Sequence, residues 1–258
     1  MASLPAQEGH IDIAFEDEHI IAINKPSGLL SHPNPGHELD SILNVLIYMG
    51  YELVGGEDPL RYGLIHRLDR DTSGLLLLSK TQEAYELFQN MFRDRVVAKI
   101  YHFPSYGKFK RMQFTRTDRL GRHPIRRNTR MVDPEGRDAE TRFELKEMYS
   151  QRHALWIAQP KTGRTHQIRV HAQAAGLSIL GDPHYSDGNA LQGLNIKVDR
   201  TLLHCYNLKF KHPITKKDVS IDAPYPEDFT KALELLSAKA NNDTQRSEAL
   251  RKPLNTTR

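Results

Sequence analysis

Alternating apolar and polar residues along the chain predict strands that pair as hairpins. Residues 75–78 are continuously apolar, which predicts a strand buried on both faces. Because hairpins outnumber strand-helix-strand units, we predict an α+β fold with a mixed, mostly antiparallel sheet. The predicted hairpins pair residues 11–15, which alternate, with the apolar run 20–23, residues 141–145, which alternate, with the apolar run 154–158, and residues 208–210 with 219–221.

Apolar residues at helical spacing predict helices between these strands. One begins at Asp40 or Ser41 and stops at Gly50. Another follows a capping box, Ser79-x-x-Gln82. The apolar face of this second helix is formed by Ala84, Leu87, Phe88, Met91 and Phe92.

A single large domain over residues 11–236 is the simplest organisation for this chain of 258 residues, with an N-terminal extension at 1–10. Residues 237–258 are too polar to bury much surface, so we expect a frayed or disordered tail. The single cysteine, Cys205, excludes an intramolecular disulfide and fits a reducing compartment. Residues 1–10 lack a signal-peptide pattern, and no apolar run approaches the roughly 20 residues of a membrane helix. We therefore expect a soluble, cytoplasmic, monomeric protein that contacts no membrane.

Positive charge is concentrated in one stretch, although the net charge is only +4. Residues 108–130 contain nine Lys or Arg and one acid, Asp118. Such a concentration favours a polyanion as partner, and a solvated charged hairpin is the alternative. The basic residues are Lys108, Lys110, Arg111, Arg116, Arg119, Arg122, Arg126, Arg127 and Arg130.

Residues 66–74, His-Arg-Leu-Asp-Arg-Asp-Thr-Ser-Gly, place charges and hydroxyls directly before the buried strand at 75–78. Asp69 is therefore expected where a core begins. A carboxylate there must be paired or hydrogen-bonded to stay ionised. Arg67 and Arg70 are nearby candidates for its partner.

This segment resembles the signature loop of the RluA-type pseudouridine synthases, H-R-L-D-x-x-T-S-G, in every fixed letter. The resemblance implies that Asp69 is the catalytic residue and that Asp71 occupies a freely varying position. It covers about residues 15–224. It implies a mixed, mostly antiparallel sheet in two halves, with flanking helices and a central active-site cleft. RNA would then be the partner of the basic stretch.

A second motif of the same family is G-R-T-H-Q-I-R-V-H at residues 163–171. Thr165 can cap a helix that ends at Gly176, with Ile168 among the residues that face the core. The resemblance implies that Arg169 pairs with Asp69, and an Arg there can hold a carboxylate ionised through a fork-like pair.

Further site residues follow from the resemblance. The K-x-Y at residues 99–101 implies that Tyr101 stacks near the target base or accepts a proton, although a phenol pKa near ~10 makes a poor base. Arg67 would fill the gap left by a flipped-out nucleotide, or form an ordinary salt bridge. Leu203 would line the uracil pocket, or be a buried strand residue. We expect His66, Thr72 and Arg164, from the two motifs, to bind substrate. Weaker matches are residues 24–28, 202–204 and 181–185, of which the last is expected to be structural.

The implied reaction is isomerisation of uridine to pseudouridine in ribosomal or transfer RNA, on a uridine that must be flipped out of its stem. It needs no redox change, so we expect no cofactor and no metal. A metal-dependent phosphatase with D-x-D-x-T fails as an alternative, because Thr72 falls one residue early and the apolar strand follows the motif. An RNA-binding protein without activity would not need Asp69, Tyr101 and Arg169 together.

Overall fold

A computed structural model describes residues 4–34, 38–54, 61–186, 190–191, 194 and 197–251, with side chains to residue 241. The four helices of this part are α1 (Ile42–Tyr48), α2 (Gln82–Arg93), α3 (Gln167–Ala174) and α4 (Glu227–Arg251). The strands are β1 (Asp12–Glu16), β2 (Ile20–Lys25), β3 (Ser73–Ser79), β4 (Ala98–Gly107), β5 (Gln113–Arg122), β6 (Arg130–Val132), β7 (Arg137–Met148), β8 (His153–Pro160), β9 (Leu177–Ile179), β10 (His204–Lys211) and β11 (Asp218–Asp222).

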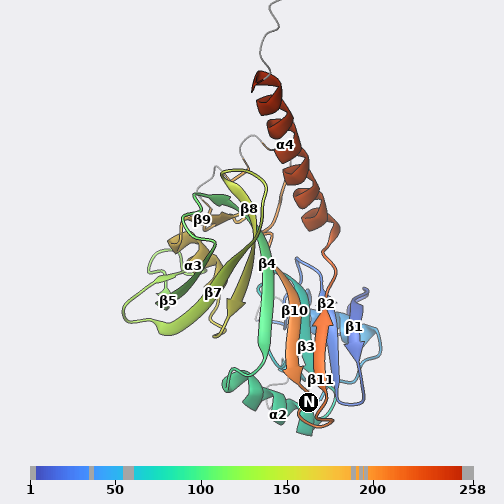
Figure 1. The fold of residues 1–258 in the computed structure, drawn as a ribbon. Coiled ribbons are helices and arrows are strands. Elements are labelled where there is room, and N and C mark those ends of the chain that lie inside the picture. The colour runs from blue at the N-terminus through green and yellow to red at the C-terminus, as the bar shows by residue number, and fades with distance from the viewer. Residues whose placement is uncertain are drawn as a thin grey trace, which may run out of the picture.

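These strands form one sheet in the order β1-β2-β3-β10-β4-β8-β7-β5-β6, with β11 paired to β10 and β9 to β4. Every pairing between these strands is antiparallel except β3 with β10. β4 joins two halves, because its beginning pairs with β10 and its remainder with β8 and β9. Figure 1 shows the halves on either side of β4. The predicted α+β fold, its hairpins and its two-half sheet are confirmed.

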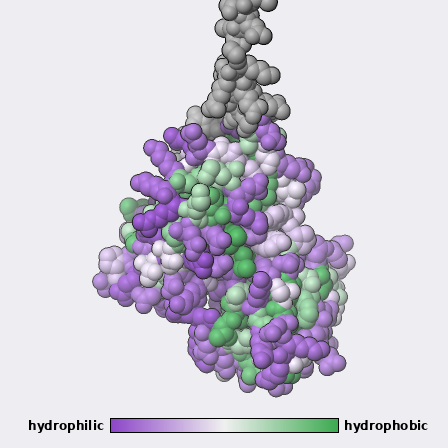
Figure 2. All heavy atoms as spheres, in the orientation of Figure 1, coloured by the Kyte–Doolittle hydropathy of each residue, from purple (hydrophilic) through white to green (hydrophobic). Residues whose placement is uncertain are grey.

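β3 is buried along its whole length, as its apolar run predicts. It lies between β2 and β10, and its start carries the residue 66–74 segment to the middle of the sheet. Gly74 makes this possible, because it has φ +104° and a Cβ there would lie 2.3 Å from the carbonyl oxygen of Cys205. On the face that Figure 2 shows, hydrophobic residues lie in areas interspersed among hydrophilic ones.

Two helix starts differ from the prediction. α2 is capped by Thr81, whose Oγ1 accepts a hydrogen bond from the Ala84 N–H at 3.2 Å. Ser79 is instead the last residue of β3, and its hydroxyl donates to the Val54 carbonyl at 2.6 Å. α3 is not capped by Thr165, because His166 occupies the cap position in a left-handed conformation. The predicted cap of α1 at Ser41 is confirmed.

α4 contradicts the expectation of a disordered tail for residues 237–251, which are helical. The segment contains three Ala and two Arg, with neither Gly nor Pro, and Ala and Arg have high helix propensity. The start of α4 is anchored by buried Phe229, Ala232 and Leu236, and its remainder extends away from the sheet (Figure 1). Residues 252–258 of the predicted tail lie outside the described residues. None of the described helices is long and apolar enough to span a membrane.

Candidate active site

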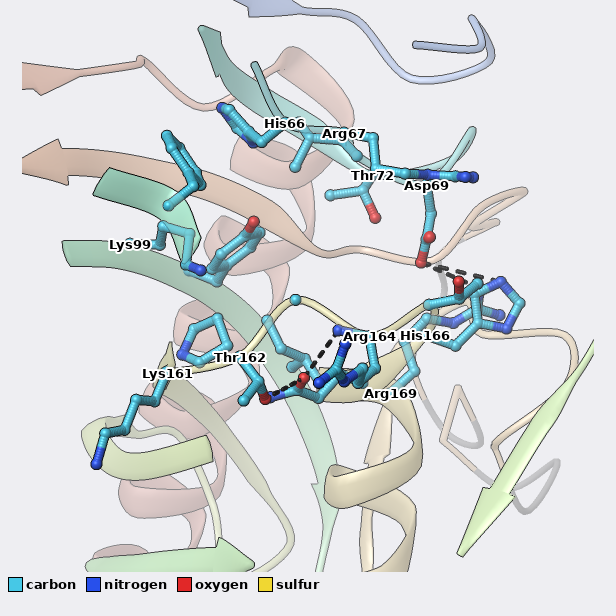
Figure 3. A pocket seen from close by; sticks show the side chains of 18 of the residues that line it. His66, Arg67, Asp69, Thr72, Lys99, Lys161, Thr162, Arg164, His166 and Arg169 are labelled. Carbon is cyan, nitrogen blue, oxygen red and sulfur yellow. Dashed lines mark hydrogen bonds and ion pairs between the residues drawn. The ribbon is translucent and has the colours of Figure 1, made fainter. Parts of the chain in front are cut away.

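A cavity of about 550 Å³ lies between the two halves of the sheet. It brings together all eight residues that the sequence assigns to catalysis or substrate binding, and the lower and upper walls face each other in Figure 3. The segment before β3 forms one wall, and the segment leading into α3 forms the other. Those eight residues are His66, Arg67, Asp69, Thr72, Tyr101, Arg164, Arg169 and Leu203.

The loop that carries Asp69 is held by backbone and side-chain hydrogen bonds. The Thr72 N–H donates to the Asp69 carbonyl at 3.1 Å, which closes a turn. The Ser31 hydroxyl donates to the Leu68 carbonyl at 2.8 Å and accepts from the Leu68 N–H at 3.0 Å. These hydrogen bonds fix the backbone position of Asp69.

Lys25 also holds the same loop, through hydrogen bonds to backbone carbonyls. It is fully buried, and its ammonium donates to the carbonyls of Pro26, Leu29 and Arg70 at 2.7, 2.8 and 3.0 Å. Three carbonyls match the three N–H donors of an ammonium, while burial lowers the pKa of Lys25 to about 7. The sequence signal for this role is a lysine at the end of an apolar strand, directly before Pro26.

Arg200 completes the support. Its Nη1 donates to the carbonyl of Asp71 at 3.0 Å, and its guanidinium forms a fork-like pair with Asp228 at the start of α4. Buried polar groups need hydrogen-bonding partners. The bonds from Ser31, Lys25 and Arg200 thus fix three parts of the loop, the carbonyls of Leu68, Arg70 and Asp71. Sequence reasoning missed Arg200, because a lone arginine between weak motifs carries no local signal.

Asp69 faces two groups across the cavity. Its Oδ2 lies 3.9 Å from Arg169 Nη1 and 3.9 Å from His166 Nε2. Arg67 and Arg70, the predicted local partners, do not fill this role. Arg70 donates from Nε to the Gly28 carbonyl at 2.7 Å, and Arg67 is exposed at the cavity mouth.

The predicted fork-like pair of Arg169 is made with Asp182 instead. Arg169 Nε lies 2.6 Å from Asp182 Oδ2, and its Nη2 lies 2.9 Å from Oδ1. The Asp182 side chain is fully buried, so it needs a bidentate cation more than the partly exposed Asp69 does. The expected contact of Arg169 with Asp69 is present at 3.9 Å, through the remaining nitrogen.

His66 has a structural contact. Its Nε2 accepts a hydrogen bond from the Leu77 N–H at 3.0 Å, and its ring stacks on Phe92 with centroids 4.8 Å apart. Burial lowers the pKa of His66 to about 3, so the ring is neutral. It fastens the segment to β3 while lining the cavity.

Tyr101 and Leu203 form the floor of the cavity. Both are buried, and the Leu203 carbonyl accepts from the Ser73 N–H at 3.1 Å. Burial, followed by the effect of neighbouring Cys205, raises the pKa of Tyr101 well above its ordinary value. The phenol is therefore protonated at neutral pH.

The cavity is lined by more cations than the motifs indicate. The sequence analysis gave no role to four further lining cations: Arg93 at the end of α2, Arg95 after it, Lys99 of the K-x-Y motif in β4, and Lys161 directly after β8. Asp69 is the one acid among the lining residues. Burial lowers the pKa of Lys99, whose Nζ lies 5.7 Å from the centroid of the Phe92 ring. A cavity with this charge fits a polyanionic ligand.

The basic stretch at residues 108–130 does not line the cavity. It comprises the segment before β5, β5 itself, the connection to β6 and the first residue of β6, and part of its charge is already paired. Arg116 forms a fork-like pair with Asp118 at 2.8 and 2.7 Å, and Arg119 lies 3.4 Å from Asp138. Arg122, Arg126 and Arg127 are among its exposed residues. The Arg130 N–H donates to the Tyr185 hydroxyl, which links this stretch to the cavity wall at His166.

Comparison with known proteins identifies the family. Residues 19–174 match the family described as RNA pseudouridylate synthase. An uncharacterised RNA pseudouridine synthase of Synechocystis is 36% identical over 234 residues, 90% of this chain and 70% of the relative. The ribosomal large subunit pseudouridine synthase D of Pseudomonas aeruginosa is 34% identical over 240 residues, 90% and 73% of the two chains.

A solved structure shares the fold. The human RNA pseudouridylate synthase domain containing 4 superposes with a TM-score of 0.66 at 23% identity, over 87% of this chain and 92% of that one. The family match spans more than half of this chain, and the two relatives are 36% and 34% identical to it. This chain therefore belongs to the RNA pseudouridine synthase family and is an enzyme that isomerises uridine in RNA to pseudouridine.

Proposed function

We propose that the enzyme modifies specific uridines in structured ribosomal or transfer RNA, with Asp69 as the catalytic carboxylate acting on a flipped-out uridine. The observation that carries the proposal is the position of Asp69, the one acid lining a cation-rich cavity between the two sheet halves. The names of several relatives specify the large ribosomal subunit, which favours ribosomal RNA as the first substrate to test.

The reaction breaks the bond from C1′ to N1, turns the uracil and joins C1′ to C5, after which C5 loses its proton and N1 gains one. Atoms and charge balance within the nucleotide, so the protein needs an ionised carboxylate, which serves as nucleophile or base. Arg169 Nη1 lies 3.9 Å from Asp69 Oδ2 and so presents a positive charge to the carboxylate.

The cavity suits a flipped-out nucleotide. Its volume of about 550 Å³ falls within the range of small-molecule sites. Tyr101 and Leu203 supply an aromatic ring and an apolar side chain for the uracil faces, and Arg67 at the exposed mouth can fill the space left in the RNA. The cations around the mouth can contact neighbouring phosphates.

The test measures tritium release from RNA labelled at uracil C5, with large-subunit ribosomal RNA and transfer RNA as separate substrates. Asp69→Asn should abolish release while RNA binding persists, because the amide is neither a nucleophile nor a base. Asp71→Asn is the matched control, two residues away, and should retain most of the activity. Substantial turnover by Asp69→Asn, or equal loss in both variants, would overturn the assignment of Asp69.

A further inference from the structure

We infer that His166 is a positioning residue for Asp69, held by the Tyr185 hydroxyl in the tautomer whose Nε2–H points at Asp69 Oδ2. This inference rests on the proposed catalytic role of Asp69 and adds a residue to it. In Figure 3, His166 and Arg169 lie side by side beneath Asp69, joined to it by dashed lines.

The backbone at His166 is the first step of the argument. His166 has φ 57° and ψ 18°, in the left-handed region that non-glycine residues rarely adopt. It occupies the cap position of α3, yet its side chain makes no capping hydrogen bond. Such a conformation has an energetic cost and is typical of functional sites. Here it turns the ring away from the helix end and toward the cavity.

The hydrogen bonds of Tyr185 are compatible with this tautomer. The Tyr185 hydroxyl oxygen accepts from the Arg130 N–H at 2.7 Å and lies 2.9 Å from His166 Nδ1. A backbone N–H can only donate, so the phenol oxygen is the acceptor in that bond. The phenol hydrogen is then available to His166 Nδ1, the other partner of this hydroxyl. If Nδ1 accepts, a neutral imidazole carries its hydrogen on Nε2.

The Nε2 donor of His166 and the Nη1 donor of Arg169 both lie near the same oxygen of Asp69. Both His166 Nε2 and Arg169 Nη1 lie 3.9 Å from Oδ2, which is about 1 Å longer than a hydrogen bond. A small rotation of the carboxylate when uridine binds would bring Oδ2 within reach of both donors. Oδ1 would then be the oxygen left to react.

The charged groups around His166 agree with a neutral donor. Asp69, Arg169, Arg130 and Asp182 all influence the ring, and burial, the largest effect, lowers the pKa of His166 below its ordinary value. A neutral N–H holds Asp69 without adding charge. Arg169 provides the positive charge beside Asp69, and His166 orients the Asp69 carboxylate.

The experiment compares His166→Phe with His166→Gln in the full chain, measuring kcat by tritium release and Kd for the RNA. Phe removes the donor, and we expect kcat to fall about 10- to 100-fold, as for the loss of a hydrogen bond to a charged group, with Kd changed less than about twofold. The Gln amide nitrogen takes the place of Nε2 and should restore most of kcat. Equal thermal unfolding temperatures would show that both variants fold.

Tyr185→Phe provides an independent measurement, because it removes the hydroxyl and keeps the ring. It should lower kcat in the wild-type background, where the tautomer depends on the hydroxyl. It should have little effect in the His166→Gln background, where no tautomer needs to be chosen. The interaction between the two substitutions therefore reports on the tautomer rather than on folding.

Wild type and Asp69→Asn are included in the same assays. If wild type releases no tritium, or Asp69→Asn remains active, the proposed function fails and not the role of His166. If Asp69→Asn is inactive while His166→Phe keeps kcat within about threefold of wild type, the role of His166 is overturned. The same holds if His166→Gln is as slow as His166→Phe.

Discussion

Arg169 lies between two carboxylates, donating from Nε and Nη2 to buried Asp182 and presenting Nη1 to Asp69 at 3.9 Å. Its guanidinium also lies over the ring of Tyr185, 4.8 Å from the centroid. Asp182 thus determines how Arg169 is oriented, and it accepts two further bonds from the N–H groups of His184 and Tyr185. A segment expected to be structural therefore fixes the cation of the active site.

Asp182→Asn should destabilise the protein by about 3–5 kcal/mol, because it leaves the buried Arg169 charge without its main partner. It should also lower kcat, since the guanidinium is free to turn away from Asp69. Urea unfolding measures the change in the free energy of unfolding. A separate assay of tritium release by the folded variant measures the change in kcat.

Asp138→Asn is the control for Asp182→Asn. Asp138 lies 3.4 Å from Arg119 on the surface, with 84% of its side chain exposed, and such pairs contribute at most about 1 kcal/mol. Equal free energies of unfolding for the two variants would show that the Arg169–Asp182 pair does not carry the stability assigned to it.

Lys25 gives a prediction about pH. Its pKa is about 7 in the folded protein and 10.5 ordinarily, so between these values the unfolded chain binds more protons. The free energy of unfolding must then rise with pH in this window, by at most about 1.4 kcal/mol per pH unit. The Lys25→Met variant has no ammonium at this position, so it lacks this contribution to the pH dependence. We expect the difference in free energy of unfolding, wild type minus variant, to increase from about pH 7 to about pH 10.

Lys80→Met is the matched control for Lys25→Met. Lys80 is partly exposed and pairs with Glu16 in the same half of the sheet, at 2.7 Å. Its substitution should not produce the rise with pH. A flat difference for Lys25→Met as well would show that Lys25 keeps its proton throughout, bound to its three carbonyls.

The sequence predicts features that depend on neighbouring residues and misses those that depend on distant ones. The apolar run of β3 and the hairpin of β7 with β8 follow from local patterns, and they are confirmed. The pairing of Arg169 with Asp182 instead of Asp69 depends on which carboxylate is fully buried, and local pattern does not show burial.

The same reasoning explains the errors at helix starts. Thr81 and Ser79 both have cap chemistry, and the register of β3 against β2 decides that Ser79 ends the strand. Motif resemblance brought the eight cavity residues together. It could not identify Arg93, Arg95 or Lys161 as cavity residues, because their position depends on how α2 and β8 meet across the cavity.

The basic stretch leaves one prediction about RNA binding. Arg122, Arg126 and Arg127 are exposed, and the ion pairs of the described residues do not include them. Replacing all three with Gln should weaken RNA binding and lower the slope of log K against log salt concentration by about two to three, because each phosphate contact releases a counterion.

A triple variant with the same change in charge tests whether pairing matters. Arg116, Arg119 and Arg142 each pair with an acid, Asp118, Asp138 and Glu144 respectively. Their replacement by Gln removes the same charge from cations that are already neutralised, so the salt slope should fall by less than about one. If both triple variants change the slope equally, net charge alone governs binding and the exposed arginines contact no particular phosphates. If neither changes it, the basic stretch faces away from the RNA, and the cations that line the cavity carry the contact.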